Sequence, residues 1–353
     1  MTNTVMIAMS GGVDSAIVAY LLKQKGYDTI AATMKIGHLY NIDYDNCCCS
    51  DQNIADAKKM ADSMGIPHFT VDLTPEFQSA VSDKFIQTYL QGATPNPCIE
   101  CNKHIKFGDL IDFAIEHGAQ KIATGHYASI VEQNGRYLLC RSKDPAKDQT
   151  YMLWKLSQDQ LSRALFPLSD MTKSEVKQIA SQLKIIAAEK KESQDICFVP
   201  DGDYASFIKN AIKRDLPQGH FKDTDGNILG THRGIIHYTP GQRKGLGIAF
   251  GEPMYVKFKS AQDNSVILCR SNELFTNTIT ANQINFIPFD KLSAPMRVTA
   301  KIRYSQNESP ATLTQTDTDE ITLEFDQPQR AVSPGQSVVM YDGDVVIGGG
   351  IIK

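Results

Sequence analysis

The sequence lacks the features of a membrane or exported protein. None of its apolar runs approaches the roughly 20 residues that a membrane-spanning helix needs. Its first residues show no basic stretch followed by an apolar segment and a small-residue cleavage site. With 353 residues, of which 42% are hydrophobic and 22% charged, the composition is typical of a globular protein of two or three domains. We therefore expect a cytoplasmic protein without a membrane partner.

The chain also lacks an excess of positive charge. Its formal net charge of −4 argues against a protein that binds nucleic acid through bulk charge alone. The charge is uneven, because residues 136–191 hold 11 Lys and Arg against 6 Asp and Glu, whereas residues 307–344 hold 8 acidic residues and one Arg. A basic middle could contact phosphates while the acidic end stays clear of them. On charge alone, a pair of solvated surface faces is the favoured interpretation of this pattern.

Strand-like and helix-like segments alternate in the first half. The sequence predicts buried strands at 5–9, 28–34, 67–73 and 121–125, and helices at 15–26, 50–65, 76–92 and 172–183. Ser50 is a plausible cap for the second helix and Gly65 its stop. This alternation predicts a doubly wound, Rossmann-like parallel α/β sheet with helices on both faces.

From about residue 230 onward the chain is rich in strand-like runs and poor in helical periodicity. The runs are GIIHYT, MYVKF, SVILC, RVTAKIRY, ATLTQ, ITLEF, QSVVMY and VVIGGGII. Turn residues separate them at intervals typical of barrels or sandwiches. We expect an α/β catalytic domain over residues 1–200, a small mixed α+β domain over 201–270, and a C-terminal β-barrel over 271–353.

The stretch MSGGVDS, residues 9–15, stands where the first strand gives way to the first helix. Glycines let a phosphate approach the main chain, and successive N–H groups at a helix start form a positive concavity. Ser10 and Ser15 can add hydroxyl donors, and Asp14 could hold a magnesium ion. The chain has no GxxxxGK[ST] motif, so lysine-assisted transfer of a γ-phosphate is not indicated. A serine- and glycine-rich turn without a ligand is the alternative, which the string SGG alone would favour but the whole stretch in this position does not.

The string SGGVDS resembles the signature of the pyrophosphatase-loop ATPases. These enzymes split ATP between the α and β phosphates and adenylate a substrate oxygen. Met34, at the end of the second strand, would lie at the same sheet edge, where ligands of open α/β sheets bind. A core methionine is the alternative at that position.

The cysteines are the second informative feature. In TPNPCIECNK, residues 94–103, the prolines on either side of Asn96 predict a stiff, non-helical loop that presents Cys98 and Cys101. A Cys-x-x-Cys pair suits half of a zinc site, a dithiol redox pair, or a nucleophile beside a helper, but no second ligand pair for zinc is present. The triplet Cys47, Cys48 and Cys49 we interpret as small residues before a helix.

Cys197 is the third thiol of interest. Lys190 and Lys191 lie near it in sequence, and nearby cations lower the pKa of a thiol and raise its reactive thiolate fraction. A buried structural cysteine is the alternative.

The order of motifs along the whole chain resembles that of the tRNA-specific 2-thiouridylases. The motifs are MSGGVDS, TPNPCIECNKHIKFG, ATGHYA, KDQTYMLW, KKESQDICF, TPGQRKGLG, KIRY and SPGQSVVMYDGDVVIGGGII. The resemblance runs from Val5 to Ile352. It implies that ATP, which we expect to bind with Mg²⁺, adenylates the C2 oxygen of the wobble uridine in tRNAs for Lys, Glu and Gln. It also implies that sulfur arrives as a persulfide from carrier proteins fed by a cysteine desulfurase.

The resemblance further implies roles for individual residues. Cys197 matches the persulfide-bearing cysteine and Cys101 the nucleophile that later forms a transient disulfide with it. The residues implied in ATP binding are Ala8, Met9, Ser10, Gly11, Gly12, Val13, Asp14, Ser15, Met34 and Gly125. Those implied at the flipped target base are Asn96, Pro97 and Cys98. Those implied in tRNA contacts are His126, Lys147, Asp148, Gln149, Arg303, Tyr304 and Gln336.

One departure from the family pattern concerns Cys98, where a common version of the family has aspartate. Any role of that carboxylate cannot be carried over to this chain. Cys98, Cys101 and Cys197 could instead converge as three soft ligands of an iron–sulfur cluster with an open iron site. A cluster-dependent thiolation therefore stands as the alternative to persulfide chemistry. Adenylation followed by attack of ammonia or an amino acid, and a non-catalytic tRNA-binding role, are two further alternatives.

Overall fold

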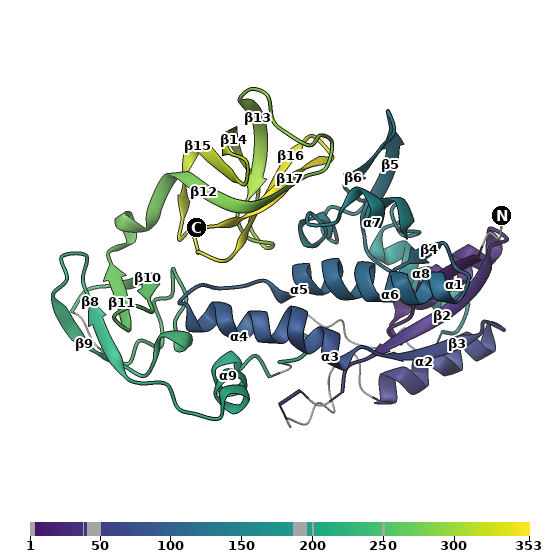
Figure 1. Cartoon of the computed structure of the whole chain (residues 1–353), viewed down its shortest axis with the longest axis horizontal. Helices are drawn as coiled ribbons and strands as arrows, with labels where there is room; N and C mark the ends of the chain where they lie inside the picture. Colours follow the sequence, from purple (N-terminus) through teal and green to yellow (C-terminus); the bar gives the residue numbers. More distant parts are fainter. Residues whose placement is uncertain (1–3, 38, 41–50, 186–195, 200, 249–250) are drawn as a thin grey trace. The chain divides into compact units, whose positions relative to one another are not determined.

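The computed structural model describes residues 4–37, 39–40, 51–185, 196–199, 201–248 and 251–353, which form two compact units. The first unit comprises Met1–Val81, Cys98–Gly202 and Asp344–Val346. The second comprises Ser82–Pro97, Asp203–Gly343 and Ile347–Lys353. The chain therefore passes from one unit to the other several times (Figure 1).

The first unit is built on a parallel sheet of five strands in the order β3-β2-β1-β4-β7. Its strands are β1 (Thr4–Ala8), β2 (Asp28–Lys35), β3 (His68–Asp72), β4 (Lys121–Ala123) and β7 (Ala164–Leu165). The central strand β1 pairs with β2 on one side and β4 on the other, so Met6 lies between Ile30 and Ile122. The strand order reverses between β1 and β4, which confirms the predicted doubly wound sheet.

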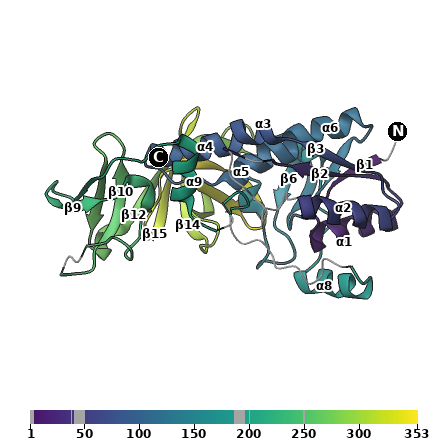
Figure 2. The ribbon, with the colours of Figure 1, turned by 90° about the horizontal axis from the view of Figure 1, so that it is seen from below.

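Helices cover both faces of this sheet, as predicted. Helices α1 (Val13–Gln24) and α2 (Asp51–Ser63) lie on one face, and α6 (Leu110–Glu116) lies on the other (Figure 2). Helix α8 (Lys173–Gln182) packs against α1 through Val176 and Ala180, which belong to the same core cluster as Ile17. Helix α2 buries Ala57, Met60 and Ala61, which stand at helical spacing.

The predicted helix at 76–92 consists of three consecutive pieces. Helix α3 (Thr74–Phe77) is followed by a π-helical turn, η1 (Gln78–Ser82), and then by α4 (Asp83–Leu90). The boundary between the two compact units falls at Val81/Ser82, within this run. The π-helical turn η1 therefore spans this boundary.

The first unit also holds a hairpin that the sequence analysis missed. Strands β5 (Ser129–Gln133) and β6 (Arg136–Cys140) pair in antiparallel fashion. Between them Asn134 and Gly135 have φ values of 52° and 75°. Positive φ at both central residues is what a two-residue hairpin turn requires, and Asn-Gly is its strongest sequence signal. That dipeptide could have revealed the hairpin.

The second unit contains a mixed sheet of four strands in the order β10-β11-β8-β9. The strands are β8 (Gly219–Lys222), β9 (Ile228–His232), β10 (Tyr255–Ser260) and β11 (Ser265–Cys269), preceded by helix α9 (Tyr204–Ile212). Of the runs predicted as strands, GIIHYT is wrong, because Ile235–His237 form a 3₁₀ turn. Ile235 and Ile236 are both buried, and His237 donates its N–H to the carbonyl of Gly234. Adjacent buried side chains do not suit a strand with one solvated face, and packing overrides their β propensity.

A six-stranded antiparallel barrel completes the second unit. Its strands are β12 (Phe275–Phe286), β13 (Met296–Lys301), β14 (Ser309–Asp317), β15 (Glu320–Arg330), β16 (Ser337–Asp342) and β17 (Val345–Ile352). Strand β12 pairs with both β15 and β17, which closes the barrel. At Gly348 an added Cβ would lie 2.1 Å from the carbonyl oxygen of Asn285, so only glycine allows the strands to meet there. The predicted C-terminal barrel is thus confirmed, although β12 escaped prediction because of its many Asn and Thr residues.

Candidate functional site

The phosphate loop joins strand β1 to helix α1, as the sequence predicts. Its backbone turns at Gly11, where φ is 72° and an added Cβ would lie 2.7 Å from the carbonyl oxygen of Asn53. The hydroxyl of Ser15 donates to the carbonyl of Gly12 at 3.0 Å and accepts the N–H of Ser10 at 3.3 Å. These bonds fix the loop in a compact form at the start of α1, where N–H groups favour an anion.

Strand β4 ends beside this loop, at the point where the strand order reverses. An added Cβ at Gly125 would lie 2.9 Å from the Cβ of Asp14 and 3.4 Å from the nitrogen of Ser15. The chain after β4 therefore packs directly on the first turn of α1. Met34 is the penultimate residue of strand β2, on the other side of β1, and lies towards the same sheet edge. The residues predicted to bind ATP thus gather where open α/β sheets bind ligands.

Asp14 is held by two side chains from other parts of the chain. The ammonium of Lys173 lies 2.7 Å from each carboxylate oxygen of Asp14, and the hydroxyl of Tyr127 donates to one of them at 3.1 Å. Lys173 is only 8% exposed, and its ammonium lies 5.8 Å from the centre of the Tyr127 ring. The sequence analysis did not single out Lys173, because nothing in the local sequence around it pointed to the loop.

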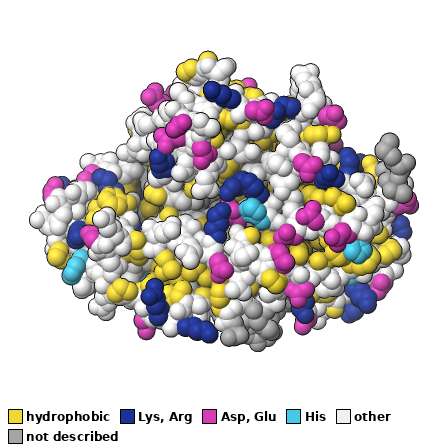
Figure 3. All heavy atoms as spheres, in the orientation of Figure 1, with side chains coloured by type: hydrophobic (Ala, Val, Ile, Leu, Met, Phe, Trp, Pro, Cys, Tyr) yellow, Lys and Arg dark blue, Asp and Glu magenta, His cyan; other side chains and the backbone are white. Residues whose placement is uncertain are grey.

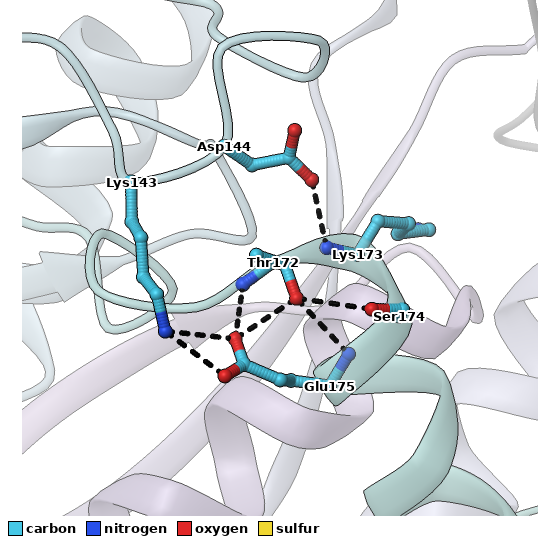
Figure 4. A network of polar contacts seen from close by, with 6 residues as sticks. All are labelled: Lys143, Asp144, Thr172, Lys173, Ser174 and Glu175. Carbon is cyan, nitrogen blue, oxygen red and sulfur yellow. Dashed lines mark hydrogen bonds and ion pairs between the residues drawn. The ribbon is translucent and has the colours of Figure 1, made fainter.

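The start of α8 positions Lys173 through a network of polar contacts (Figure 4). Thr172 caps the helix and exchanges hydrogen bonds with Glu175, and Asp144 accepts the backbone N–H of Lys173 at 2.9 Å. Lys143 donates to both oxygens of Glu175. Hydrogen bonds, first from the backbone of Thr172 and then from Lys143, lower the pKa of Glu175 to about 2. The backbone of Lys173 is therefore anchored.

The predicted non-helical loop around Cys98 and Cys101 is wrong beyond Asn96. Helix α5 (Pro97–Glu100) runs into the π-helical segment η2 (Cys101–Asp109), and both cysteines lie in this helical run. Pro97 is the first helical residue, where its missing N–H costs nothing and its φ suits the helix. Cys98 is half-buried and Cys101 only 9% exposed, so the segment shields Cys101 rather than presenting it.

A buried ion pair that the sequence analysis missed anchors this helix. Glu100, between the two cysteines, accepts a hydrogen bond from the ammonium of Lys155 at 2.6 Å, and both side chains are about nine-tenths buried. His104 lies one turn further on, with its Nε2 at 3.4 Å from the other oxygen of Glu100. The amide of Asn102 donates to the carbonyl of Met152. The segment 150–155 thus holds the helix start on which both cysteines lie.

Cys197 lies in a short turn in the first unit and is half-buried. The turn is closed by the N–H of Val199, which donates to the carbonyl of Ile196, and Phe198 packs edge-on against Phe77 at 5.4 Å. Lys190 and Lys191, and the triplet Cys47 to Cys49, lie outside the described residues. Within the described ranges no three Cys, His, Asp or Glu side chains gather in a way that could hold a metal ion.

The residues implied in tRNA contacts in the first unit are mostly turned into the protein. His126 is 9% exposed, its Nδ1 bonds to the hydroxyl of Thr124, and burial and then the charge of Lys106 keep its pKa well below the usual range. Asp148 is buried and accepts the N–H groups of Ser142 and Thr150. Gln149 exchanges hydrogen bonds with the backbone of Tyr127. Lys147 is partly exposed. That these residues contact tRNA stays a prediction.

The corresponding residues of the second unit have different settings. Arg303 donates to the carbonyl of Ala331 and to the hydroxyl of Ser333 at 2.8 Å, whereas Tyr304 is 39% exposed. The amide of Gln336 donates to the carbonyls of Thr94 and Pro95 at 3.1 and 3.4 Å. Gln336 therefore holds the segment that leads into Cys98.

Acidic and basic side chains are interspersed over the face of the molecule in Figure 3. Among the described residues, no helix is both long enough and apolar enough to cross a bilayer.

Comparisons with known families match nearly the whole chain. Residues 3–201 match the model described as the tRNA methyl transferase HUP domain. Residues 205–270 match the tRNA methyl transferase PRC-barrel domain, and residues 276–352 the aminomethyltransferase beta-barrel domain. The HUP domain match indicates an ATP-using enzyme, in agreement with the phosphate loop on β1 and α1.

Individual proteins agree with these models. The chain is 49% identical to the tRNA-specific 2-thiouridylase MnmA of Clostridioides difficile, over 100% of this chain and 99% of that protein. It is 47% identical to the protein of the same name from Clostridium acetobutylicum, over 100% of both chains. A 4-thiouridine synthetase–RNA complex with bound ATP shares 17% identity and a TM-score of 0.37 over 60% of this chain and 50% of that one, which is too distant to support an argument. On the full-length similarity to the two MnmA proteins, the chain belongs to the tRNA-specific 2-thiouridylase family.

Proposed function

We propose that the chain catalyses ATP-dependent thiolation of C2 of the wobble uridine in tRNA. As a member of its family it is a tRNA-thiolating enzyme, a sulfurtransferase that uses ATP. The observation that carries the finer mechanism is the composition of the first unit. It holds a phosphate loop at the reversal point of a parallel sheet, and it holds both Cys101 and Cys197.

The first step is adenylation of the base. The C2 oxygen attacks the α-phosphorus of ATP, the bond to the bridging oxygen breaks, and diphosphate leaves with the electron pair. A urea-like carbonyl oxygen is a poor leaving group and becomes a good one as an adenylate. The loop residues 8–15, with Met34 and Gly125, would bind the nucleotide and stabilise the charge that develops on the phosphates.

Magnesium, where present, would be held at Asp14. A carboxylate and phosphate oxygens are the ligands that Mg²⁺ prefers, and Asp14 is the carboxylate of the loop. Both oxygens of Asp14 accept hydrogen bonds from Lys173 in this structure. A magnesium ion would therefore bind Asp14 either beside the ammonium of Lys173 or in its place. The ion would screen phosphate charge.

The second step transfers sulfur from Cys197 to the base. A persulfide on Cys197, loaded by a persulfide carrier fed by a cysteine desulfurase, attacks C2 through its outer sulfur, and AMP leaves with the C2 oxygen. The Cys101 thiolate then attacks the Sγ of Cys197 and breaks the S–S bond. The thiocarbonyl is released, a Cys101–Cys197 disulfide forms, and a dithiol reductant must reopen it.

The different exposures of the two thiols support this division of roles. Cys197 is half-buried, so a carrier can reach it, whereas Cys101 is 9% exposed and lies in a helix. A shielded thiol is protected from loading and oxidation. In the proposed cycle Cys101 has to react only once, inside the closed site.

The tRNA substrate presents a base that must leave its stack. C2 of a wobble uridine is inaccessible within a stacked anticodon loop, so the base has to be extruded. Asn96, Pro97 and Cys98 would contact the extruded base at the start of the helical run that carries Cys101. The tRNAs for Lys, Glu and Gln are the proposed acceptors. The proposed tRNA contacts come from His126, Lys147, Asp148, Gln149, Arg303, Tyr304 and Gln336.

A cluster-dependent mechanism does not fit the described residues. It requires Cys98, Cys101 and Cys197 to converge as three ligands, and no such group is present among the residues that the structure describes. We therefore derive no step through an iron–sulfur cluster. Iron and sulfide analysis of protein purified without oxygen tests this conclusion, and thiolation that requires bound iron would reverse it.

Reconstituted thiolation is the decisive test of the persulfide mechanism. With tRNA, ATP, a persulfide donor and a reductant, mass spectrometry of the anticodon nucleosides should show 2-thiouridine. Cys101→Ser and Cys197→Ser should each lower its yield by more than about a hundredfold, because each removes the only sulfur that can perform its step. Binding of tRNA should stay within about twofold of wild type.

Cys140→Ser is a matched control in the same unit. Burial raises the pKa of the Cys140 thiol, which makes it a poor nucleophile. Its replacement should leave the yield unchanged. Full yield of 2-thiouridine with Cys197→Ser would contradict sulfur transfer through this residue. An aminated base in place of 2-thiouridine would favour adenylation followed by attack of an amine. Release of diphosphate that depends on tRNA would exclude a purely non-catalytic tRNA-binding role.

A further inference from the structure

We propose that Lys173 is a catalytic lysine of the ATP site, which rests on Asp14 before the nucleotide binds and then moves its ammonium to the phosphates that leave as diphosphate. This inference rests on the proposed adenylation and adds a residue to it. It explains how a phosphate loop without a lysine of its own handles a highly charged ligand.

The loop itself offers hydroxyls and N–H groups but no positive side chain. Residues 9–15 contain no Lys or Arg, and the first cation of α1 is Lys23, in the last turn of that helix. Diphosphate gains negative charge as it leaves, and a fixed or mobile cation is the usual means of stabilising it. Lys173 supplies this charge from a helix that begins about 160 residues further along the chain.

The geometry places this ammonium against the loop. It lies 2.7 Å from both oxygens of Asp14, which is in the first turn of α1, and Gly125 packs on the same residue. The ammonium of Lys173 is thus held at the first turn of α1, the helix whose N–H groups would bind phosphate. A salt bridge at a partly exposed carboxylate is readily exchanged for a ligand with several negative charges.

The contacts at the start of α8 fix the backbone of Lys173 and do not involve its ammonium group. The N–H is fixed by Asp144, and the cap is fixed by Thr172, Glu175 and Lys143 (Figure 4). Val176 and Ala180 attach the helix to the core. None of these contacts uses the ammonium group, so the side chain can move while its helix stays in place. For the same reason a Lys173→Met variant should fold.

The test compares ligands that differ in their phosphates. Binding of α,β-methylene-ATP, inorganic diphosphate and AMP, each without tRNA, is measured by calorimetry. Lys173→Met should weaken binding of the first two by about 10- to 100-fold, as expected for the loss of a charged hydrogen bond. Binding of AMP should change by less than about threefold. Lys173→Arg, which keeps a cation, should recover part of the affinity.

Lys143→Met provides the matched control. It removes an ammonium from the same network, but one that pairs with Glu175 and not with the loop. Its affinity for all three ligands should stay within about twofold of wild type. Thermal melting of each variant shows whether it is folded.

Two results would overturn the proposal: unchanged binding of the ATP analogue and diphosphate by Lys173→Met, or an equal loss of affinity for AMP. An equal loss of affinity for AMP would show that Lys173 only stabilises the loop and does not bind the leaving phosphates. Wild-type protein that binds none of the three ligands would refute both this inference and the ATP chemistry. Wild-type protein that binds them but forms no thiolated tRNA would refute only the proposed function.

Discussion

At the scale of single residues, the ion pair of Glu100 and Lys155 holds the helix start that carries both cysteines. Its Nζ–Oε1 distance is 2.6 Å, and both side chains are about nine-tenths buried. Removing one partner of a buried pair leaves an uncompensated charge, which commonly costs about 3–5 kcal/mol. Lys155→Met should therefore lower the free energy of unfolding by about this amount, as measured by urea denaturation.

The double variant Glu100→Gln with Lys155→Met separates charge from packing. It leaves no buried charge at the pair, so its stability should return to within about 1–2 kcal/mol of wild type. The alkylation rate of Cys101 adds a second measurement. In Lys155→Met the carboxylate of Glu100 has lost its lysine partner, so its negative charge should disfavour the Cys101 thiolate and slow alkylation at neutral pH. A single variant as stable as the wild type would show that the pair has no such role.

At the scale of elements, Lys259 joins strand β10 to the end of helix α4. Its ammonium bonds to the carbonyl of Ala93 at 3.3 Å and lies 5.2 Å from the centre of the Tyr89 ring. Lys259 is 8% exposed, and this desolvation lowers its pKa to about 8. The unfolded chain keeps the proton up to a pH of about 10.4. Between these values the unfolded state binds more protons, so stability rises with pH.

This contact predicts a specific pH dependence. From about pH 7.5 to pH 9.5 the wild type should gain about 2 kcal/mol of unfolding free energy relative to Lys259→Met, as measured by urea denaturation at each pH. Burial raises the pKa of Tyr89 to about 12. Ionisation of Tyr89 therefore lowers stability as the pH rises, but only above a pH of about 10. Parallel curves for the two proteins across this range would contradict the account.

The same scale shows what the sequence could predict. The parallel strands, the loop on β1 and α1, and most barrel strands follow from periodicity and turn residues, which are local properties. The helical run Pro97–Asp109 was not predicted, because Pro95 and Pro97 were interpreted as excluding a helix. Pro97 is in fact the first residue of this helix. The contacts Lys173–Asp14 and Lys155–Glu100 join residues far apart in sequence. Such pairs become visible only after folding brings their elements together.

At the scale of the whole molecule, the proposed tRNA contacts are divided between the two units. His126, Lys147, Asp148 and Gln149 belong to the first unit, and Arg303, Tyr304 and Gln336 to the second. The chain passes between the units at Pro97/Cys98, within the segment proposed to contact the target base. Because the net charge is −4, we expect affinity for tRNA to depend on a few placed cations.

This distribution predicts how salt acts on the two substrates. A tRNA contacted through several phosphates releases several counterions, so its affinity should fall steeply and linearly on a logarithmic salt scale. Binding of ATP, at one compact site, should fall less. Lys147→Gln should reduce the salt slope for tRNA by about 1, as expected for one phosphate contact, without changing that for ATP. Lys291→Gln, a matched change of an exposed lysine outside the proposed contacts, should leave the tRNA slope unchanged. Filter binding at several salt concentrations measures these slopes, and equal slopes for tRNA and ATP in the wild type would contradict multiple phosphate contacts.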